Sequence, residues 1–141
     1  MALDFHENID LAITLLGRVR RAYLTPVLRK RGFPPPMFDI LMCINDHPGA
    51  SQDLVADATC LDKATVARDA CRLESDGYLM RVNSFIDRRQ YELYLTDEGE
   101  KLAESALGDL RAWSDRLTAG LTDEEKRQLL DLLKRMAENL E

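Results

Sequence analysis

Two short helices in the middle of the chain constrain the fold most. Ser51 is a favourable N-cap for a helix over residues 51–58. An aspartate is a favourable N-cap for a second helix over residues 62–76, which Gly77 closes. Only the segment 59–61 separates the two helices. Two short helices joined by a tight turn are the sequence outline of a helix-turn-helix.

Two segments with strand character follow this pair of helices. The first covers residues 78–82, and the second covers residues 91–95, where apolar and polar side chains alternate. The polar segment 83–90 joins them. This pattern predicts a β-hairpin directly after the second helix. A winged helix-turn-helix, here called the reading head, is therefore expected over about residues 37–96.

A long helix is expected before the reading head. Apolar side chains recur at helical spacing over residues 4–31, and they extend too far around the helix for one partner helix to cover them. Pro26 is expected to kink or shorten this helix, and Gly32 is expected to stop it. The three prolines 34–36 predict an extended link to a helix over residues 37–46.

Two further helices are expected after the hairpin. Thr96 is a suitable cap for a helix over residues 97–118, and residues 122–125 form a capping box that opens a last helix with a broad stripe of leucines. The chain has 141 residues, so it is expected to be a single domain over residues 1–141. The predicted fold class is mainly α with a small β-hairpin wing.

The second of the two short helices has two different faces. Val66, Ala70 and Leu73 lie within about 40° of one another around the helix and are expected to be buried. The outward residues combine small side chains with threonine, arginine and lysine. A DNA major groove suits this combination, because small residues let the backbone approach while arginine and threonine reach bases and phosphates. An ordinary solvated helix is the alternative interpretation.

The charge of the chain is unusual for a protein that binds nucleic acid. The formal net charge is −6, from 19 basic and 25 acidic side chains. Residues 32–99 carry six basic and twelve acidic side chains, whereas residues 61–91 carry six basic and five acidic ones. Any DNA-binding surface must therefore be local. A regulator that acts mainly through protein–protein contacts, with weak or partner-dependent DNA binding, is the alternative.

The segment between the two predicted strands contains Asp87, Arg88 and Arg89. In a wing, these arginines are expected to enter a narrow minor groove, whose negative potential attracts them. Asp87 is expected to pair with one arginine and hold it in position. Phe85 and Ile86 precede this motif. They are expected to pack in a local minicore, and an exposed apolar contact is the alternative.

Several short motifs occur in a characteristic order along the chain. They are Arg31-Gly32-Phe33 before Met37-Phe38-Asp39-Ile40-Leu41, His47-Pro48-Gly49-Ala50-Ser51-Gln52-Asp53-Leu54, Leu61-Asp62-Lys63-Ala64-Thr65-Val66-Ala67-Arg68, Arg72-Leu73-Glu74-Ser75-Asp76-Gly77-Tyr78, Arg81, Asp87-Arg88-Arg89 and Leu95-Thr96-Asp97-Glu98-Gly99. The last two, at this separation, are the most specific. Through these motifs the chain resembles, over nearly its whole length, the MarR family of winged helix-turn-helix regulators.

The resemblance implies a homodimer in which dimerisation helices, about residues 4–31 and 97–141, interlock with those of the partner. It implies a sequence-specific transcriptional regulator, most often a repressor, that binds double-stranded DNA at a pseudopalindromic operator. A small-molecule effector is expected between the dimerisation helices and the reading head. Carried over position by position, the residues expected to contact DNA are Ser51, Lys63, Ala64, Thr65, Ala67, Arg68, Arg72, Asp87, Arg88 and Arg89.

The sequence also departs from the usual pattern of this family at several positions. Phe85 and Ile86 stand where many members have a proline and an acidic residue. Asp69 occupies a usually apolar position, Val55 replaces a usual alanine, and Ala64 replaces a usual serine. These departures concern the wing and the recognition helix, so they bear on base preference and wing conformation.

Other classes of function find little support in the sequence. It contains no Gly-rich phosphate loop, no zinc motif and no Ser or Cys with a plausible catalytic His partner, so no enzyme, metal or cofactor is expected. Cys71 lies beside Arg72 and is a candidate redox switch, with an incidental thiol as the alternative. No apolar segment reaches the ~20 residues of a membrane span, and the first residues lack a basic signal region. A soluble cytoplasmic protein without a membrane partner is expected.

Overall fold

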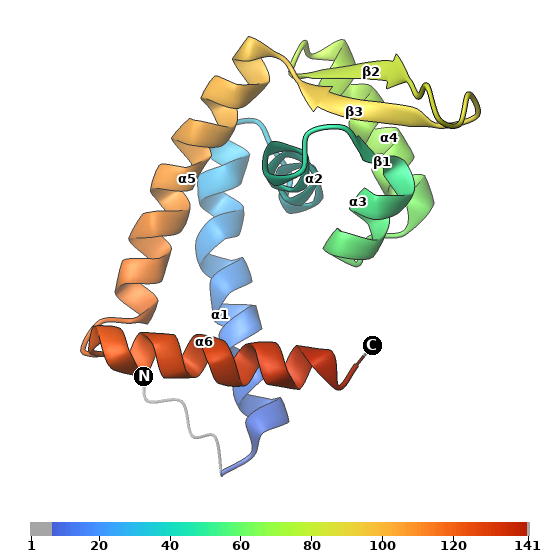
Figure 1. The fold of residues 1–141 in the computed structure, drawn as a ribbon. Helices are drawn as coiled ribbons and strands as arrows, with labels where there is room; N and C mark the ends of the chain where they lie inside the picture. Colours follow the sequence, from blue (N-terminus) through green and yellow to red (C-terminus); the bar gives the residue numbers. More distant parts are fainter. Residues whose placement is uncertain (1–6, 141) are drawn as a thin grey trace. The chain divides into compact units, whose positions relative to one another are not determined.

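The computed structural model describes residues 7–140, which belong to two compact units, one up to Asp109 and one from Leu110. In chain order the elements are α1 (Ile9–Lys30), α2 (Pro35–Asp46), β1 (Ala50–Ser51), α3 (Gln52–Thr59), α4 (Lys63–Ser75), β2 (Leu79–Asn83), β3 (Tyr91–Leu95), α5 (Asp97–Leu117) and α6 (Asp123–Glu138) (Figure 1). The fold is mainly helical with one small sheet, which confirms the predicted class. Within the described residues, no helix is long and apolar enough to cross a membrane.

The two caps predicted for the helix-turn-helix are present. Ser51 accepts a hydrogen bond from the N–H of Leu54 at the start of α3, at 3.1 Å. Asp62 accepts one from the N–H of Thr65 at the start of α4, at 2.8 Å. Between the helices, Cys60 adopts a left-handed conformation with φ of 56°. Because each cap satisfies an N–H that has no partner inside its helix, these local signals are sufficient to position both helix starts.

The core of the first unit lies between α2, α3, α4 and the sheet. Val66, Ala70 and Leu73 are 0% exposed, which confirms the predicted inward stripe of α4. Other residues of this core are Met37, Ile40, Leu41, Ile44, Val55, Leu79 and Leu93. Because α4 is anchored along this entire stripe, its opposite face is held outward.

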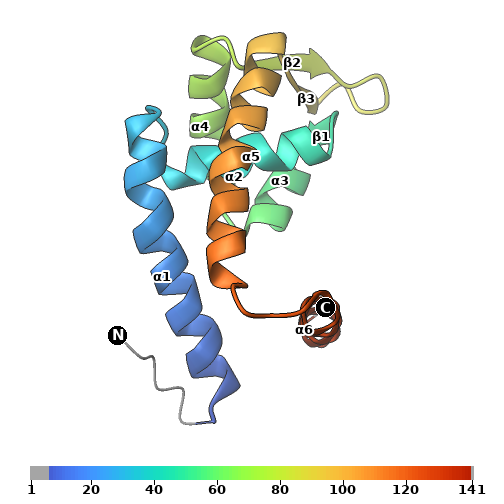
Figure 2. The same ribbon diagram turned by 90° about the vertical axis from the view of Figure 1, so that its left-hand side faces the viewer.

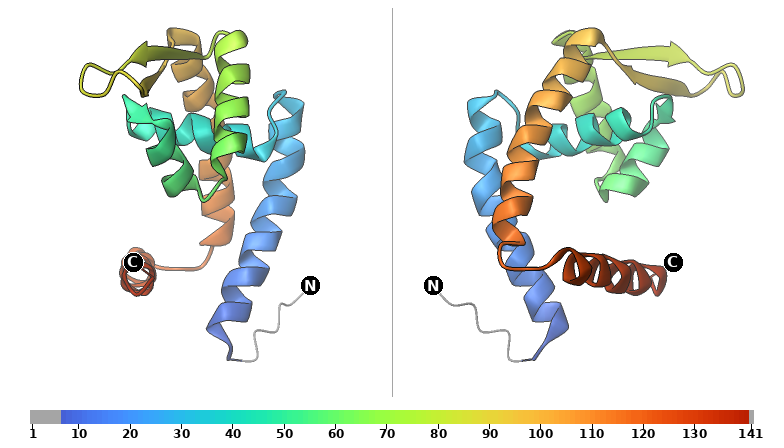
Figure 3. Two further views of the ribbon diagram at one scale, coloured as in Figure 1. Left: turned by 90° about the vertical axis from the view of Figure 1, so that its right-hand side faces the viewer. Right: turned by 60° about the vertical axis from the view of Figure 1, so that its left-hand side comes forward.

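The predicted hairpin is present and belongs to a three-stranded antiparallel sheet in the order β1-β3-β2. Leu93 on the central strand lies opposite Arg81 on one side and Ala50 on the other. β1 could not be predicted from sequence, because two residues are too few to show an alternating pattern. Figures 2 and 3 show the loop of the hairpin projecting beyond α3 and α4.

The effects of the prolines differ in part from those predicted. Pro26 lies inside α1 and does not shorten it, since the helix continues to Lys30. Only Pro34 is extended, with ψ of 150°, whereas Pro35 and Pro36 already belong to the first turn of α2. Proline fits there because the first N–H groups of a helix have no intrahelical partner. The helix therefore begins two residues before its predicted start.

The first turns of α1 expose apolar side chains to solvent. The helix begins at Ile9, and the predicted start at residues 4–6 lies outside the described residues. Farther along, Leu24 and Leu28 are buried. Towards the beginning, Ile9 and Ile13 are 64% and 46% exposed. Only the later turns of α1 are thus covered within one copy of the chain.

The junction between the wing and α5 explains the motif Leu95-Thr96-Asp97-Glu98-Gly99. The Thr96 hydroxyl donates to the carbonyl of Gly77 at 2.6 Å and accepts from the N–H of Gly99 at 3.1 Å. A Cβ on Gly99 would overlap the carbonyl oxygen of Tyr78, so only glycine fits. This short segment therefore caps α5 and ties it to the end of α4.

The second unit comprises the last part of α5 and α6. Thr122 and Glu125 form the predicted capping box, in which each side chain accepts a hydrogen bond from the other residue's N–H, at 3.2 and 2.7 Å. No residue of α6 is buried. Its apolar stripe is exposed to solvent in one copy of the chain, and the exposed leucines on it are Leu129, Leu130, Leu132 and Leu133.

Candidate nucleic-acid interface

The outward face of α4 carries six of the residues that the sequence analysis expects to contact DNA. None of them is buried. The exposed ones are Lys63, Ala64, Arg68 and Arg72, and the half-buried ones are Thr65 and Ala67. This face therefore places small side chains between longer cationic ones, which lets another backbone approach the helix closely.

Two cations of this face form solvent-exposed ion pairs. Lys63 Nζ lies 2.7 Å from Asp53 Oδ1 on α3, and Arg72 Nε lies 4.0 Å from Asp76 Oδ2. The hydrogen bond to Asp53 raises the pKa of Lys63. Because exposed ion pairs contribute little stability, phosphate groups can replace these carboxylates as partners of the two cations.

Arg68 is held by a carboxylate of a different kind. Asp69 is only 7% exposed, and its Oδ1 accepts a hydrogen bond from Arg68 Nε at 3.2 Å. The Arg68 side chain itself is 70% exposed. This bond engages Nε and leaves the two terminal nitrogens available to external acceptors. Asp69 thus restrains the Nε of Arg68, a contact that was not predicted from the unusual acidic side chain.

Thr65 is engaged by the cap of its own helix. Its hydroxyl donates to Asp62 Oδ2 at 2.7 Å, and its N–H donates to Asp62 Oδ1 at 2.8 Å. These two bonds, the hydroxyl bond first, lower the pKa of Asp62. Because the hydroxyl hydrogen is used within the protein, Thr65 can offer a base only its oxygen lone pair and its methyl group.

In the wing, Arg88 and Arg89 are both exposed on the loop of the hairpin. Asp87 Oδ1 accepts a hydrogen bond from the N–H of Arg89 at 3.0 Å. Over residues 7–140, no ion pair joins Asp87 to either arginine side chain. Asp87 therefore shapes the backbone of the loop, rather than holding a guanidinium as expected.

The minicore expected for Phe85 and Ile86 is absent. Phe85 is 96% exposed and Ile86 is 97% exposed. A loop that projects from the end of a two-stranded hairpin has no second layer of structure against which these side chains could pack. Their exposure agrees with the alternative interpretation, whose apolar contact stays a prediction.

Arg81 joins the wing to α4. Its Nε donates to Glu74 Oε2 on α4 at 2.8 Å, and its guanidinium carbon lies 5.5 Å from the centroid of the Tyr91 ring on β3. The bond with Glu74 raises the pKa of Arg81. The sequence analysis named Arg81 only as part of a motif. Its role was missed because its two partners lie on different elements.

Ser51 and Arg89 lie close to each other in the structure. Both line a cleft of about 190 Å³ between the start of α3 and the base of the wing, together with Gln52 and Tyr91. The Ser51 side chain is half-buried and serves as the cap of α3. The first turn of α3 and the wing thus border the same cleft.

Comparison with known proteins assigns the family. The MarR family model matches residues 33–91, which include the helix-turn-helix and most of the wing. The HTH-type transcriptional regulator BilQ of Clostridium symbiosum (strain WAL-14163) is 33% identical over 114 residues, which are 81% of this chain and 79% of that protein. The chain belongs to the MarR family.

A solved structure and a further relative agree with this assignment. A MarR transcriptional regulator from Methanosarcina mazei Go1 matches with a TM-score of 0.84 and 30% identity, over 94% of this chain and 96% of that one. The homoprotocatechuate degradative operon repressor of Escherichia coli is 22% identical over 128 residues, which are 91% of this chain and 86% of that protein. These relatives are regulators of transcription rather than enzymes.

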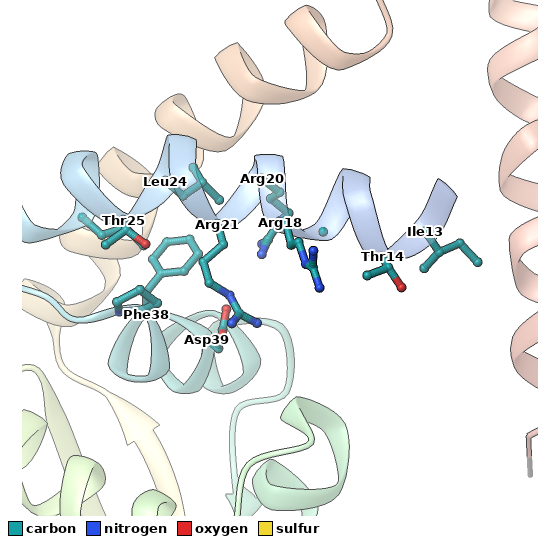
Figure 4. A pocket seen from close by; sticks show the side chains of 12 residues that line it. Ile13, Thr14, Arg18, Arg20, Arg21, Leu24, Thr25, Phe38 and Asp39 are labelled. Carbon is teal, nitrogen blue, oxygen red and sulfur yellow. The ribbon is translucent and has the colours of Figure 1, made fainter. Parts of the chain in front are cut away.

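The MarR-family chain also has a cavity of about 420 Å³ between α1 and α2 (Figure 4). Leu24 and Phe38 supply apolar wall, and Arg20 and Arg21 supply positive charge. Burial raises the pKa of Asp39 in this wall, against the opposing effect of the two arginines. The sequence analysis identified no pocket residue, because the cavity exists only where two separate helices meet.

The cysteines of this MarR-family chain differ in accessibility. Cys71 is exposed on the outward face of α4 and Cys60 is exposed in the turn, whereas Cys43 is half-buried. Oxidation at Cys71 stays a prediction. Over residues 7–140, no three His, Cys, Asp or Glu side chains are grouped so that they could hold a metal ion.

Proposed function

We propose that this chain is a sequence-specific DNA-binding repressor that acts as a homodimer on a pseudopalindromic operator. The observation that carries the proposal is that one compact unit presents both the cationic outward face of α4 and the exposed Arg88 and Arg89 of the wing. Arg81 holds these two surfaces together through Glu74 and Tyr91. Two linked contact surfaces suit a duplex, in which major and minor grooves alternate at a regular spacing.

The candidate residues have two kinds of role on DNA. Thr65 and Arg68 read base edges in the major groove, and Ala64 and Ala67 permit the close approach that this reading requires. The other candidates position the protein through phosphates and the minor groove, and they are Ser51, Lys63, Arg72, Arg88 and Arg89. Asp87 shapes the loop that presents the two arginines.

Exposed apolar faces favour a second copy of the chain as partner. In the first unit, Ile9, Ile13, Leu16 and Val19 along α1 are between 38% and 64% exposed. In the second unit, no residue of α6 is buried. Covering these faces with their counterparts in another copy removes apolar surface from water. Twofold symmetry then directs the two α4 helices to half-sites about one helical turn apart.

The cavity between α1 and α2 is the proposed effector site. Arg20 and Arg21 attract an anion, while Leu24 and Phe38 contact an apolar body, so a small organic acid suits the lining. α1 is a proposed dimerisation helix and α2 belongs to the reading head. A ligand that contacts both helices can bind better to one spacing of the two reading heads than to another. Such a ligand would shift the dimer toward the spacing that it prefers.

Selection of random duplexes by the purified full-length chain tests this function, with Arg88→Ala as a parallel sample. The expected result is a palindrome enriched by the wild-type chain, with weaker retention of all duplexes by Arg88→Ala. Light scattering after gel filtration should give the mass of a dimer.

Failure to enrich any sequence at low salt would overturn the DNA-binding proposal. The affinity should also fall steeply as salt rises, because each phosphate that the protein neutralises releases counterions. An affinity that barely responds to salt would favour the alternative role through protein–protein contacts.

A further inference from the structure

The loop of the wing exposes two large apolar side chains side by side in the sequence. Phe85 and Ile86 are 96% and 97% exposed, more than any other large apolar side chain in residues 7–140. Single exposed apolar residues are common, but two adjacent ones at the end of a projecting hairpin have a cost in water unless something covers them.

The turn that presents this pair is ordered by hydrogen bonds. The Ser84 hydroxyl accepts from the N–H of Ile86 at 3.2 Å and from the N–H of Asp87 at 3.4 Å. The Ser84 N–H donates to the carbonyl of Gln90 at 3.0 Å, and the Gln90 N–H donates to the carbonyl of Asp87 at 2.9 Å. Ser84 is itself buried. These bonds close the base of the loop and leave the side chains of residues 85 and 86 exposed on its outer side.

The charged residues next to Phe85 and Ile86 indicate what kind of partner surface covers these two side chains. Arg88 and Arg89 follow within three residues, and both are exposed. Phe85 and Arg88 line one hollow of about 640 Å³ beside β2. An apolar tip bordered by exposed guanidinium groups is complementary to a surface with apolar faces between rows of negative charge. The stacked bases and phosphates of a duplex provide such a surface.

We propose that Phe85 and Ile86 act as an apolar wedge that enters the minor groove beside Arg88 and partly unstacks one base step of the operator. This inference rests on the proposed DNA-binding function and adds a deformation of the DNA to it. Apolar wedges of this kind kink the duplex toward the major groove. The step that yields most readily is pyrimidine–purine, so TA or CA/TG steps are expected where each wing contacts the operator.

The test uses the operator obtained by selection, with 2-aminopurine placed at the step that the wing contacts and donor and acceptor dyes at the two ends. Binding of the wild-type dimer should raise 2-aminopurine fluorescence, because the base loses its stacking, and should shorten the end-to-end distance. Phe85→Ser combined with Ile86→Ser should abolish both signals and weaken binding by roughly tenfold. Met80→Ser removes a partly exposed apolar side chain from β2 of the same hairpin and is the matched control.

The salt dependence separates the wedge from the arginines. The double serine variant should bind more weakly with the same slope of log affinity against log salt, because no charge is removed. Arg88→Ala should lower that slope by about one. A double serine variant that binds as tightly as the wild-type chain, or a wild-type complex without a 2-aminopurine signal, would overturn the wedge and leave the proposed function intact. A chain that binds no duplex would overturn both.

Discussion

The recognition helix α4 and the wing loop over residues 84–90 present arginines in opposite physical settings. α4 is anchored by a fully buried stripe, and its Arg68 is hydrogen-bonded to the buried carboxylate of Asp69. In the wing loop only Ser84 is buried. Among the residues that the structure describes, no carboxylate forms an ion pair with the arginines of the loop.

This difference assigns selectivity for a DNA sequence to α4 and general attraction to DNA to the wing loop. A side chain that is already oriented loses little conformational freedom when it binds. Its hydrogen bonds to a base edge depend on which base is present, so a mismatched base removes them and weakens binding. An unpaired guanidinium on a projecting loop attracts phosphates and the negative minor groove with little regard to sequence. We therefore expect changes in α4 to alter which DNA is bound, and changes in the arginines of the wing to alter how tightly any DNA is bound.

The largest expected effect concerns folding. Leu73→Ala should lower the free energy of unfolding by ~2–5 kcal/mol, because it removes a fully buried side chain and leaves a cavity. Phe85→Ser should change it by less than ~0.5 kcal/mol, since Phe85 contacts almost nothing in the free protein. Urea denaturation followed by circular dichroism measures both. Similar losses for the two variants would contradict the contrast in burial.

The next effect concerns DNA affinity. Arg68→Ala should weaken operator binding by ~1–3 kcal/mol and relax the preference at one base position. Arg88→Ala should weaken binding to operator and random duplexes about equally. Fluorescence anisotropy with both duplexes measures the difference. The contrast between helix and wing fails if the two variants lose the same fraction of affinity on both duplexes.

Asp69→Asn tests whether the buried carboxylate positions Arg68. Asparagine keeps the shape but removes the charge-assisted hydrogen bond, so operator affinity should fall by about 1 kcal/mol, with little change on random DNA. Asp76→Asn is the matched control, because it removes the exposed partner of Arg72 instead. A loss of operator preference in the control as large as in Asp69→Asn would argue against positioning by Asp69.

The smallest expected effect has the opposite sign. Asp53→Asn removes the partner of Lys63, so the lysine becomes free to contact phosphate. Affinity for operator and random duplexes should both rise, by roughly two- to threefold at low salt, and the gain should disappear at high salt. Asp57→Asn removes the same charge from the same helix without breaking that ion pair, and it should have less effect. Unchanged or weaker binding by Asp53→Asn would show that the pair does not restrain Lys63.

Much of the reading head could be predicted from sequence because its signals are local. The caps of α3 and α4 and the inward stripe of α4 each depend on residues within a few positions of one another. The start of α2 was placed too late because Pro35 was interpreted as extended, although proline also fits a first helical turn. β1 was missed because its pairing partner lies some forty residues away on β3.

The candidate site could be predicted only in part, for a related reason. The outward residues of α4 follow from the helical period, and the wing arginines follow from their place between two strands. The role of Arg81 could not be predicted, because it depends on Glu74 and Tyr91 lying on different elements. The exposure of Phe85 could not be predicted either, since an apolar side chain in a loop is equally compatible with burial and with projection.

By itself, the sequence determined the helix-turn-helix, the hairpin, the capped helix starts and the resemblance to the MarR family, because each of these depends on residue types at short separations. Only the tertiary structure decided that Asp53 pairs with Lys63, where α1 and α2 line a cavity, and that the apolar pair of the wing stays uncovered. These features depend on how separate helices and strands are placed relative to one another. Such distances are set by the packing of the whole core rather than by any local pattern.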